Sequence, residues 1–99
     1  MAEQPLQEIK LEIKKLIVDT LNIGTINPEE ILNDVPLLSG DNVITIDSID
    51  VLEVVVAIQK QFKVRMDDQN LVRHIINTID TIAEFVYAQQ QKSKVASNA

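Results

Sequence analysis

The stretch IDSIDVLEVVVAIQKQF, residues 46–62, decides the fold of this chain. At about 100° per residue, its apolar residues form a stripe roughly 100° wide along one side, which is typical of a helix that packs on a core. This stripe consists of Val51, Val54, Val55, Ile58 and Phe62. We therefore predict a helix from about Ser48 to Phe62, with this stripe buried.

A second apolar stripe lies on a different side of the same predicted helix, next to two acidic residues. The stripe is Ile49, Leu52 and Val56, and the acids are Asp50 and Glu53. A surface helix of a small domain needs only one buried side. The second stripe is therefore either covered by the long segment before the helix or exposed for a partner, since exposed apolar patches often mark binding sites. The pattern alone leaves both alternatives open.

The chain before this helix predicts one more helix and a long connection. Pro5 suits the first turn of a helix, and Asn22 and Gly24 are expected to end it. The apolar stripe of this helix is Leu6, Ile9, Ile13, Leu16 and Ile17. Residues 25–47 have an irregular pattern, so we predict a long loop that packs across the helices, with a short helical turn at Pro28–Leu32.

Two further helices are predicted in the C-terminal part of the chain. Asp67–Asp68 supplies an N-cap for a short third helix, on which Arg73 and His74 are expected to face outward. Its inward residues are Leu71, Val72, Ile75 and Ile76. Thr81 and Glu84 have the spacing of a capping box, which predicts the start of a fourth helix.

These patterns predict an all-α fold, a four-helix bundle with a long first loop and a short third helix. The chain has 99 residues, of which 45% are hydrophobic, and this is enough for one domain around one core. We expect residues 1–99 to form that single domain, with about 4–90 ordered and 92–99 a frayed tail.

The composition also predicts where the protein works. The chain has no cysteine, and its polar first residues lack the layout of a signal peptide. The longest apolar run, Val54–Ile58, is far too short for a membrane span. We therefore expect a soluble, cytoplasmic protein, monomeric and without a membrane span.

The charge pattern argues against nucleic acid as a partner. The net charge is −6, and no Lys or Arg occurs from Leu16 to Gln59. Such an acidic region repels phosphates and attracts basic protein surfaces. Three aromatic residues are too few for a platform on which bases stack. An acidic surface that serves only solubility explains the same charge pattern equally well.

The hydroxyl of Ser48 lies between two acids, which is a poor setting for a nucleophile. No base adjoins it in sequence, and Asp47 and Asp50 would oppose the negative charge that develops on an attacking oxygen. His74 is the single histidine, no acids or histidines have metal-binding spacing, and two glycines cannot form a phosphate-binding loop. A triad of Ser48, His74 and a carboxylate is a remote alternative.

The residues around Ser48 resemble the prosthetic-group region of the acyl carrier proteins. In that family an Asp-Ser-Leu/Ile motif opens the second helix of a four-helix bundle. The matching residues here are Asp47, Ser48, Ile49, Asp50, Glu53 and Phe62, with the loop segment Asp34-Val35-Pro36-Leu37. The order of the predicted helices over about residues 4–90 also resembles that of the family.

The resemblance implies a carrier, not an enzyme, whose Ser48 bears 4′-phosphopantetheine as a phosphodiester. A separate Mg²⁺-dependent transferase would attach the group from coenzyme A, which explains the missing base. At the start of a helix, Ser48 would place the phosphate where an anion is favoured. Acyl intermediates would be carried as thioesters to enzymes of fatty acid, polyketide or related lipid biosynthesis. A Ser48 that only caps the helix is the simpler alternative.

The resemblance also gives roles to the two stripes. Partners would be the phosphopantetheinyl transferase and acyl-processing enzymes with basic docking surfaces. The residues implied in their recognition are Asp47, Ile49, Asp50, Leu52, Glu53 and Val56. The residues implied in a cavity for the acyl chain are Val54, Val55, Ile58, Ile75 and Ile79.

Some residues depart from the family pattern. Thr45 stands where many members have glycine, and Lys60, Lys63 and Arg65 follow where the helix end is often acidic. A specialised carrier is therefore open beside the housekeeping carrier of fatty acid synthesis. The alternative from another class is a small acidic helical adaptor, which docks a partner through the same helix without a prosthetic group.

Overall fold

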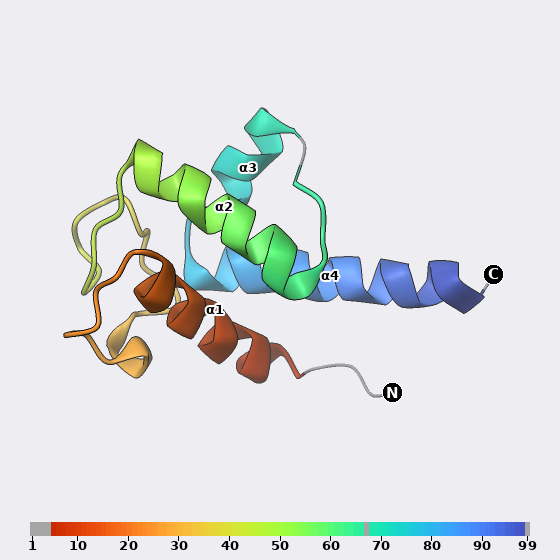
Figure 1. Ribbon diagram of the computed structural model, residues 1–99, viewed down its shortest axis with the longest axis horizontal. Helices are drawn as coiled ribbons and strands as arrows, with labels where there is room; N and C mark the ends of the chain where they lie inside the picture. Colours follow the sequence, from red (N-terminus) through yellow and green to blue (C-terminus); the bar gives the residue numbers. More distant parts are fainter. Residues whose placement is uncertain (1–4, 67, 99) are drawn as a thin grey trace.

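Four α-helices make up the fold in the computed structural model, which describes residues 5–66 and 68–98 (Figure 1). They are α1 (Leu6–Thr20), α2 (Ser48–Phe62), α3 (Gln69–Ile75) and α4 (Ile79–Asn98), and a 3-10 turn, η1, spans Pro28–Glu30. The described residues form no strand, so the predicted all-α fold is confirmed. α4 continues beyond residue 92, and the fraying of residues 92–99 stays a prediction.

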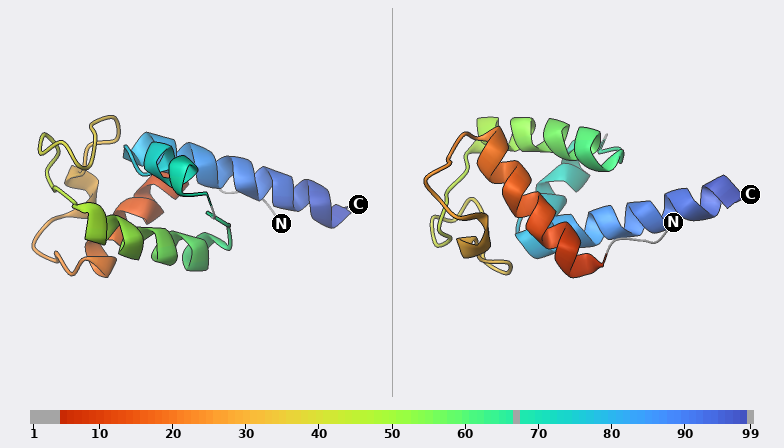
Figure 2. Two further views of the ribbon diagram at one scale, coloured as in Figure 1. Left: turned by 90° about the horizontal axis from the view of Figure 1, so that it is seen from above. Right: turned by 60° about the horizontal axis from the view of Figure 1, so that its bottom comes forward.

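α1 packs against both α2 and α4, while α3 packs against α4. The right-hand view of Figure 2 shows α1 running diagonally from the start of α2 to the first part of α4. α1 buries Ile9, Ile13 and Ile17, which lie one turn apart and therefore share one face. This face brings the first and last helices of the chain together around the core.

One ion pair joins the same two helices. Lys10 Nζ lies 2.9 Å from Asp80 Oδ1, and both side chains are about a quarter to a third exposed. An ion pair of this exposure contributes roughly 0–1 kcal/mol to stability. The packing of α1 on α4 therefore depends mainly on its buried isoleucines.

The predicted bounds of α2 are confirmed, and so is its core stripe. Val54, Val55, Ile58 and Phe62 are buried, and Val51 is partly buried against the same core. Val54 and Ile58 have no exposed surface. This side of α2 packs against α1 and contributes to the shared hydrophobic core.

The long connection between α1 and α2 is folded around one buried polar side chain, Asn42. Its Nδ2 donates hydrogen bonds of 3.0 Å to the carbonyl oxygens of Leu32 and Val35. Its Oδ1 accepts hydrogen bonds from the N–H groups of Leu32, at 2.9 Å, and Val43, at 2.8 Å. The amide thus satisfies four backbone groups within residues 32–43, which form neither helix nor strand.

Backbone hydrogen bonds attach this connection to the rest of the fold. The Leu37 N–H donates to Asn77 O at 2.8 Å, and the Asp80 N–H donates to Asn33 O at 3.0 Å. Within the connection, the Ile46 N–H donates to Leu37 O at 3.1 Å. Its buried apolar residues are Ile31, Leu37, Ile44 and Ile46. The connection therefore packs across the helices, as predicted, and is bonded to the junction between α3 and α4.

The cap of α4 differs from the prediction. The helix begins three residues earlier than the Thr81–Glu84 box would place it. Thr78 Oγ1 accepts from the Thr81 N–H at 3.1 Å, and Thr81 Oγ1 accepts from the Thr78 N–H at 3.0 Å. Thr81 Oγ1 also donates to Ile75 O at 2.7 Å. The predicted capping box is therefore wrong, because Thr78 and Thr81 form a reciprocal pair instead.

Two other local predictions change in the structure. α1 ends at Thr20, and Asn22 takes the left-handed conformation with φ 59°, whereas Gly24 does not. On α3, Asp68 is the N-cap as predicted, while Asp67 lies outside the described residues. Leu71 is 45% exposed, so the prediction that it faces inward is wrong.

Among the residues that the structure describes, no helix combines the length and the apolar character needed to cross a membrane.

Candidate functional site at the start of α2

The start of α2 is fixed by a reciprocal pair of aspartates. Asp47 is the N-cap, and its Oδ1 accepts a hydrogen bond of 2.9 Å from the Asp50 N–H. In return, Asp50 Oδ2 accepts a hydrogen bond of 3.2 Å from the Asp47 N–H. This capping box satisfies two backbone donors at the helix end. The alternative in which Ser48 caps the helix is therefore wrong, because Asp47 does so.

Ser48 is exposed and is the first helical residue of α2. Since capping falls to Asp47, the position of Ser48 cannot be explained by a need to start the helix. The helix N-terminus behind it carries partial positive charge, which favours a covalently attached phosphate. An exposed hydroxyl at this point fits a phosphodiester to a flexible arm.

The three predicted recognition acids lie at the N-cap and in the first two turns of α2, with different exposure. Asp47 and Glu53 are exposed, whereas Asp50 is half-buried and lines a pocket beside the helix start. The capping box places the carboxylates of Asp47 and Asp50 next to each other. The surface beside Ser48 is therefore negative, which suits a basic partner.

The second stripe of α2 lies in solvent. Ile49 is 70% exposed, Leu52 is 66% exposed and Val56 is 51% exposed. The long connection therefore does not cover this exposed stripe, which excludes the first of the two alternatives, while a role in binding a partner stays a prediction. Three large apolar side chains at i, i+3 and i+7 form a continuous line on one helix face.

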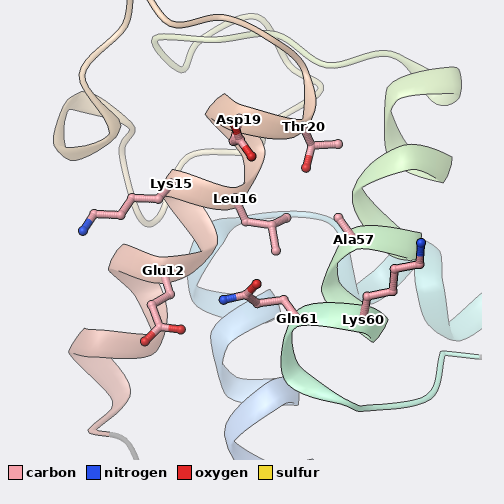
Figure 3. Close-up of a pocket in the computed structure, with 8 residues that line it drawn as sticks. All are labelled: Glu12, Lys15, Leu16, Asp19, Thr20, Ala57, Lys60 and Gln61. Atoms are coloured by element: carbon pink, nitrogen blue, oxygen red, sulfur yellow. The ribbon is translucent and has the colours of Figure 1, made fainter.

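The residues predicted for an acyl cavity are part of the packed core. Val54, Val55, Ile58, Ile75 and Ile79 are all buried. A pocket of about 330 Å³ lies between the start of α2 and the long connection, and a groove of about 540 Å³ lies between α1 and α2 (Figure 3). Other residues line both of these spaces. A cavity role for the five core residues therefore stays a prediction.

The connection before Ser48 contains a glycine with a conformational role, Gly40. It lies five residues before Thr45, the position where many members of the resembled family have glycine. Gly40 takes φ 86°, which L side chains rarely adopt. Thr45 is exposed and lies 3.9 Å from where a Cβ on Gly40 would stand. The connection before α2 thus has its left-handed glycine at position 40, and position 45 holds a threonine.

Asn42 is the residue of this region that the sequence pattern did not single out. It lies in a polar Gly-Asp-Asn run that reads as an exposed turn, yet it is buried. The available signal was the alternation of Ile44 and Ile46 with Thr45 and Asp47, because extended to residue 42 this period of two puts Asn42 on the same side as the two isoleucines.

Within the described part of the chain, no cluster of three or more Asp, Glu or His side chains could hold a metal ion. His74 is exposed on α3, as predicted.

Comparison with known proteins agrees with the family resemblance of the residues around Ser48. Residues 12–86 match the family model described as a phosphopantetheine attachment site. The chain is 26% identical to the acyl carrier protein of Buchnera aphidicola subsp. Schizaphis graminum (strain Sg) over 87 residues, which cover 88% of this chain and all of that protein. Members of this family carry phosphopantetheine and are carriers, not catalysts. The chain therefore belongs to the acyl carrier protein family.

Proposed function

We propose that this protein carries acyl groups on a 4′-phosphopantetheine attached to Ser48, and presents them to enzymes of fatty acid, polyketide or related lipid biosynthesis. The observation that carries the proposal is the exposure of Ser48 at the first position of α2, beside an N-cap supplied by another residue. A hydroxyl that is exposed and not needed for capping is available for modification.

Ser48 Oγ would form the new ester bond to the phosphate as the pyrophosphate bond of coenzyme A breaks, adenosine 3′,5′-bisphosphate would leave, and the hydroxyl proton would pass to the transferase or to water. Because a separate transferase would catalyse the attachment, this chain needs no base next to Ser48. The acids of this region would instead help to bind the transferase. Asp47 at the N-cap and Glu53 in the second turn of α2 are exposed, and they would attract the basic docking surface of the transferase. When attached, the group supplies a terminal thiol on which acyl groups are carried as thioesters.

The buried stripe of α2 would serve the cargo. Val54, Ile58 and Ile79 are fully buried, and their methyl-rich side chains form no hydrogen bonds that would break on separation. An acyl chain could therefore enter between the helices at the cost of apolar contacts alone. We further propose that the protein is a cytoplasmic monomer; the lack of cysteine fits a reducing compartment.

Intact mass spectrometry tests the attachment. The purified protein is incubated with coenzyme A, Mg²⁺ and a broad-specificity phosphopantetheinyl transferase, and one phosphopantetheine is expected to add. Ser48→Ala should abolish the mass gain and keep the fold. Ser39→Ala is the matched control, since it removes another exposed hydroxyl from the same part of the chain and should load normally.

The exposed stripe of α2 also supports a second candidate, an adaptor that docks a partner without a prosthetic group. The same experiment separates the two functions. Wild type that gains no mass with an active transferase would favour the adaptor, and an adduct on Ser48→Ala would place the attachment elsewhere.

A further inference from the structure

The exposed face of α2 has opposite charges at its two ends. The acids Asp47 and Glu53 lie at the N-cap and in the N-terminal half of α2, and the exposed Lys60 and Lys63 lie in its last turn and at its C-cap. Lys60 is one turn beyond Val56 and two turns beyond Glu53, so it shares their face. Figure 3 shows Lys60 pointing away from α1, while the neighbouring Gln61 points towards it.

The two charged ends are too far apart to neutralise each other. Glu53 and Lys60 are two helical turns apart, which is about 10 Å along the axis. This exceeds the ion-pair distance of about 4 Å and is close to the Debye length at physiological salt. Val56, 51% exposed, lies between them. A partner therefore meets a negative end, an apolar centre and a positive end as separate features.

We propose that this face selects protein partners whose docking surface is basic at one end and acidic at the other. The inference rests on the proposed function, because it concerns which enzymes reach the arm on Ser48. The partner would place basic groups against Asp47 and Glu53, an apolar pocket on Leu52 and Val56, and a carboxylate against Lys60 and Lys63. A surface that is basic throughout would be repelled by the two lysines.

This arrangement also fixes the direction in which a partner docks. Reversal of the partner along α2 would bring like charges together at both ends, and such contacts are costly. With one direction favoured, the active site of the partner lies towards Ser48. The lysines would therefore be specificity-determining residues although they are far from the attachment point.

The test uses two phosphopantetheinyl transferases of known structure as probes. One has a docking surface that is basic throughout, and the other has Asp or Glu beyond its basic region. The measured quantity is kcat/KM for loading of Ser48, at low salt and at high salt. Lys60→Glu/Lys63→Glu is the variant, and Lys92→Glu/Lys94→Glu, which gives the same change of net charge outside α2, is the control.

Relative to the control, the α2 variant should lose kcat/KM with the mixed-charge transferase, on the order of tenfold at low salt, and gain with the basic one. Both differences should shrink at high salt.

Equal effects of the two double variants on both transferases would overturn the inference while leaving the attachment site intact. Binding of wild type to phosphatidylglycerol vesicles that the α2 variant loses would also overturn it, by assigning the lysines to a lipid surface. No loading of wild type by either transferase would contradict the proposed function itself.

Discussion

The two apolar sides of α2 have nearly the same residue types but opposite surroundings. Val54, Val55, Ile58 and Phe62 have at most 8% of their surface exposed, whereas the exposed stripe has from 51% to 70%. Hydrophobicity alone therefore does not indicate what a residue does on this helix. One side stabilises the fold, and the other is available to a partner at little cost to the fold.

The largest expected effect comes from the buried side. Phe62→Ala removes most of a buried aromatic side chain and leaves a cavity, so it should lower the free energy of unfolding by about 3–5 kcal/mol. Leu52→Ala is the matched control on the exposed stripe and should change stability by no more than about 0.5 kcal/mol. Urea denaturation of both variants measures the difference. Similar losses for the two would mean that the sides of α2 are not distinct.

The next largest effect is expected in the long connection between α1 and α2. It shows whether this connection contributes to the free energy of unfolding as the buried side of α2 does. Asn42→Ala removes four hydrogen bonds and leaves partly buried backbone groups without these partners. We expect a loss of about 2–3 kcal/mol in the free energy of unfolding. Ser39→Ala, which removes an exposed side chain of the same connection, should cost less than about 1 kcal/mol. An Asn42→Ala protein as stable as wild type would show that the connection is only a tether.

Two substitutions of Asp47, with smaller expected effects, distinguish its role as the N-cap of α2 from the role of its negative charge. Asp47→Ala should cost about 1 kcal/mol, because it removes the N-cap, while Asp47→Asn retains an acceptor and should cost little. Both variants lose the same charge, so both should be loaded more slowly at low salt, with a deficit that shrinks as salt rises. Thermal melts and loading rates supply the two measurements. Normal loading of Asp47→Asn at low salt would remove this residue from recognition.

The smallest effect on stability is expected on the exposed stripe. Val56→Ser should change the free energy of unfolding by no more than about 0.5 kcal/mol, because Val56 is half exposed. Docking to a partner enzyme should nevertheless weaken, since an apolar contact is lost. Urea denaturation measures the free energy of unfolding, and a titration with the transferase measures the affinity of docking. A destabilisation comparable with that of Phe62→Ala would mean that the stripe is buried after all.

The sequence was most informative where one local signal was strong and had no competitor. The apolar spacing in residues 46–62 predicted both ends of α2, and the acid at position 68 predicted the N-cap of α3. At the start of α4, two threonines three residues apart are both able to cap. The choice between them depends on the tertiary fold, because Thr81 Oγ1 bonds back to Ile75 O.

Other features depend on contacts that no local pattern contains. Leu71 fits an inward position by spacing, but α3 is so short that one of its apolar residues remains 45% exposed. Asn42 acts through partners up to ten residues away. At the site, spacing predicted the helix and its two stripes, whereas the role of Ser48 as an attachment point came from family resemblance and stays a proposal.

The packing of α1 against α4 has a consequence for how the protein is made. Residues at the two ends of the chain, such as Lys10 and Asp80, meet in the finished fold. The core therefore cannot close until α4 has left the ribosome, and contacts so distant in sequence slow the search for the native state. We expect a nascent chain that stops before α4 to lack the ordered start of α2. Modification of Ser48 would then have to wait until α4 has been made and has packed on α1.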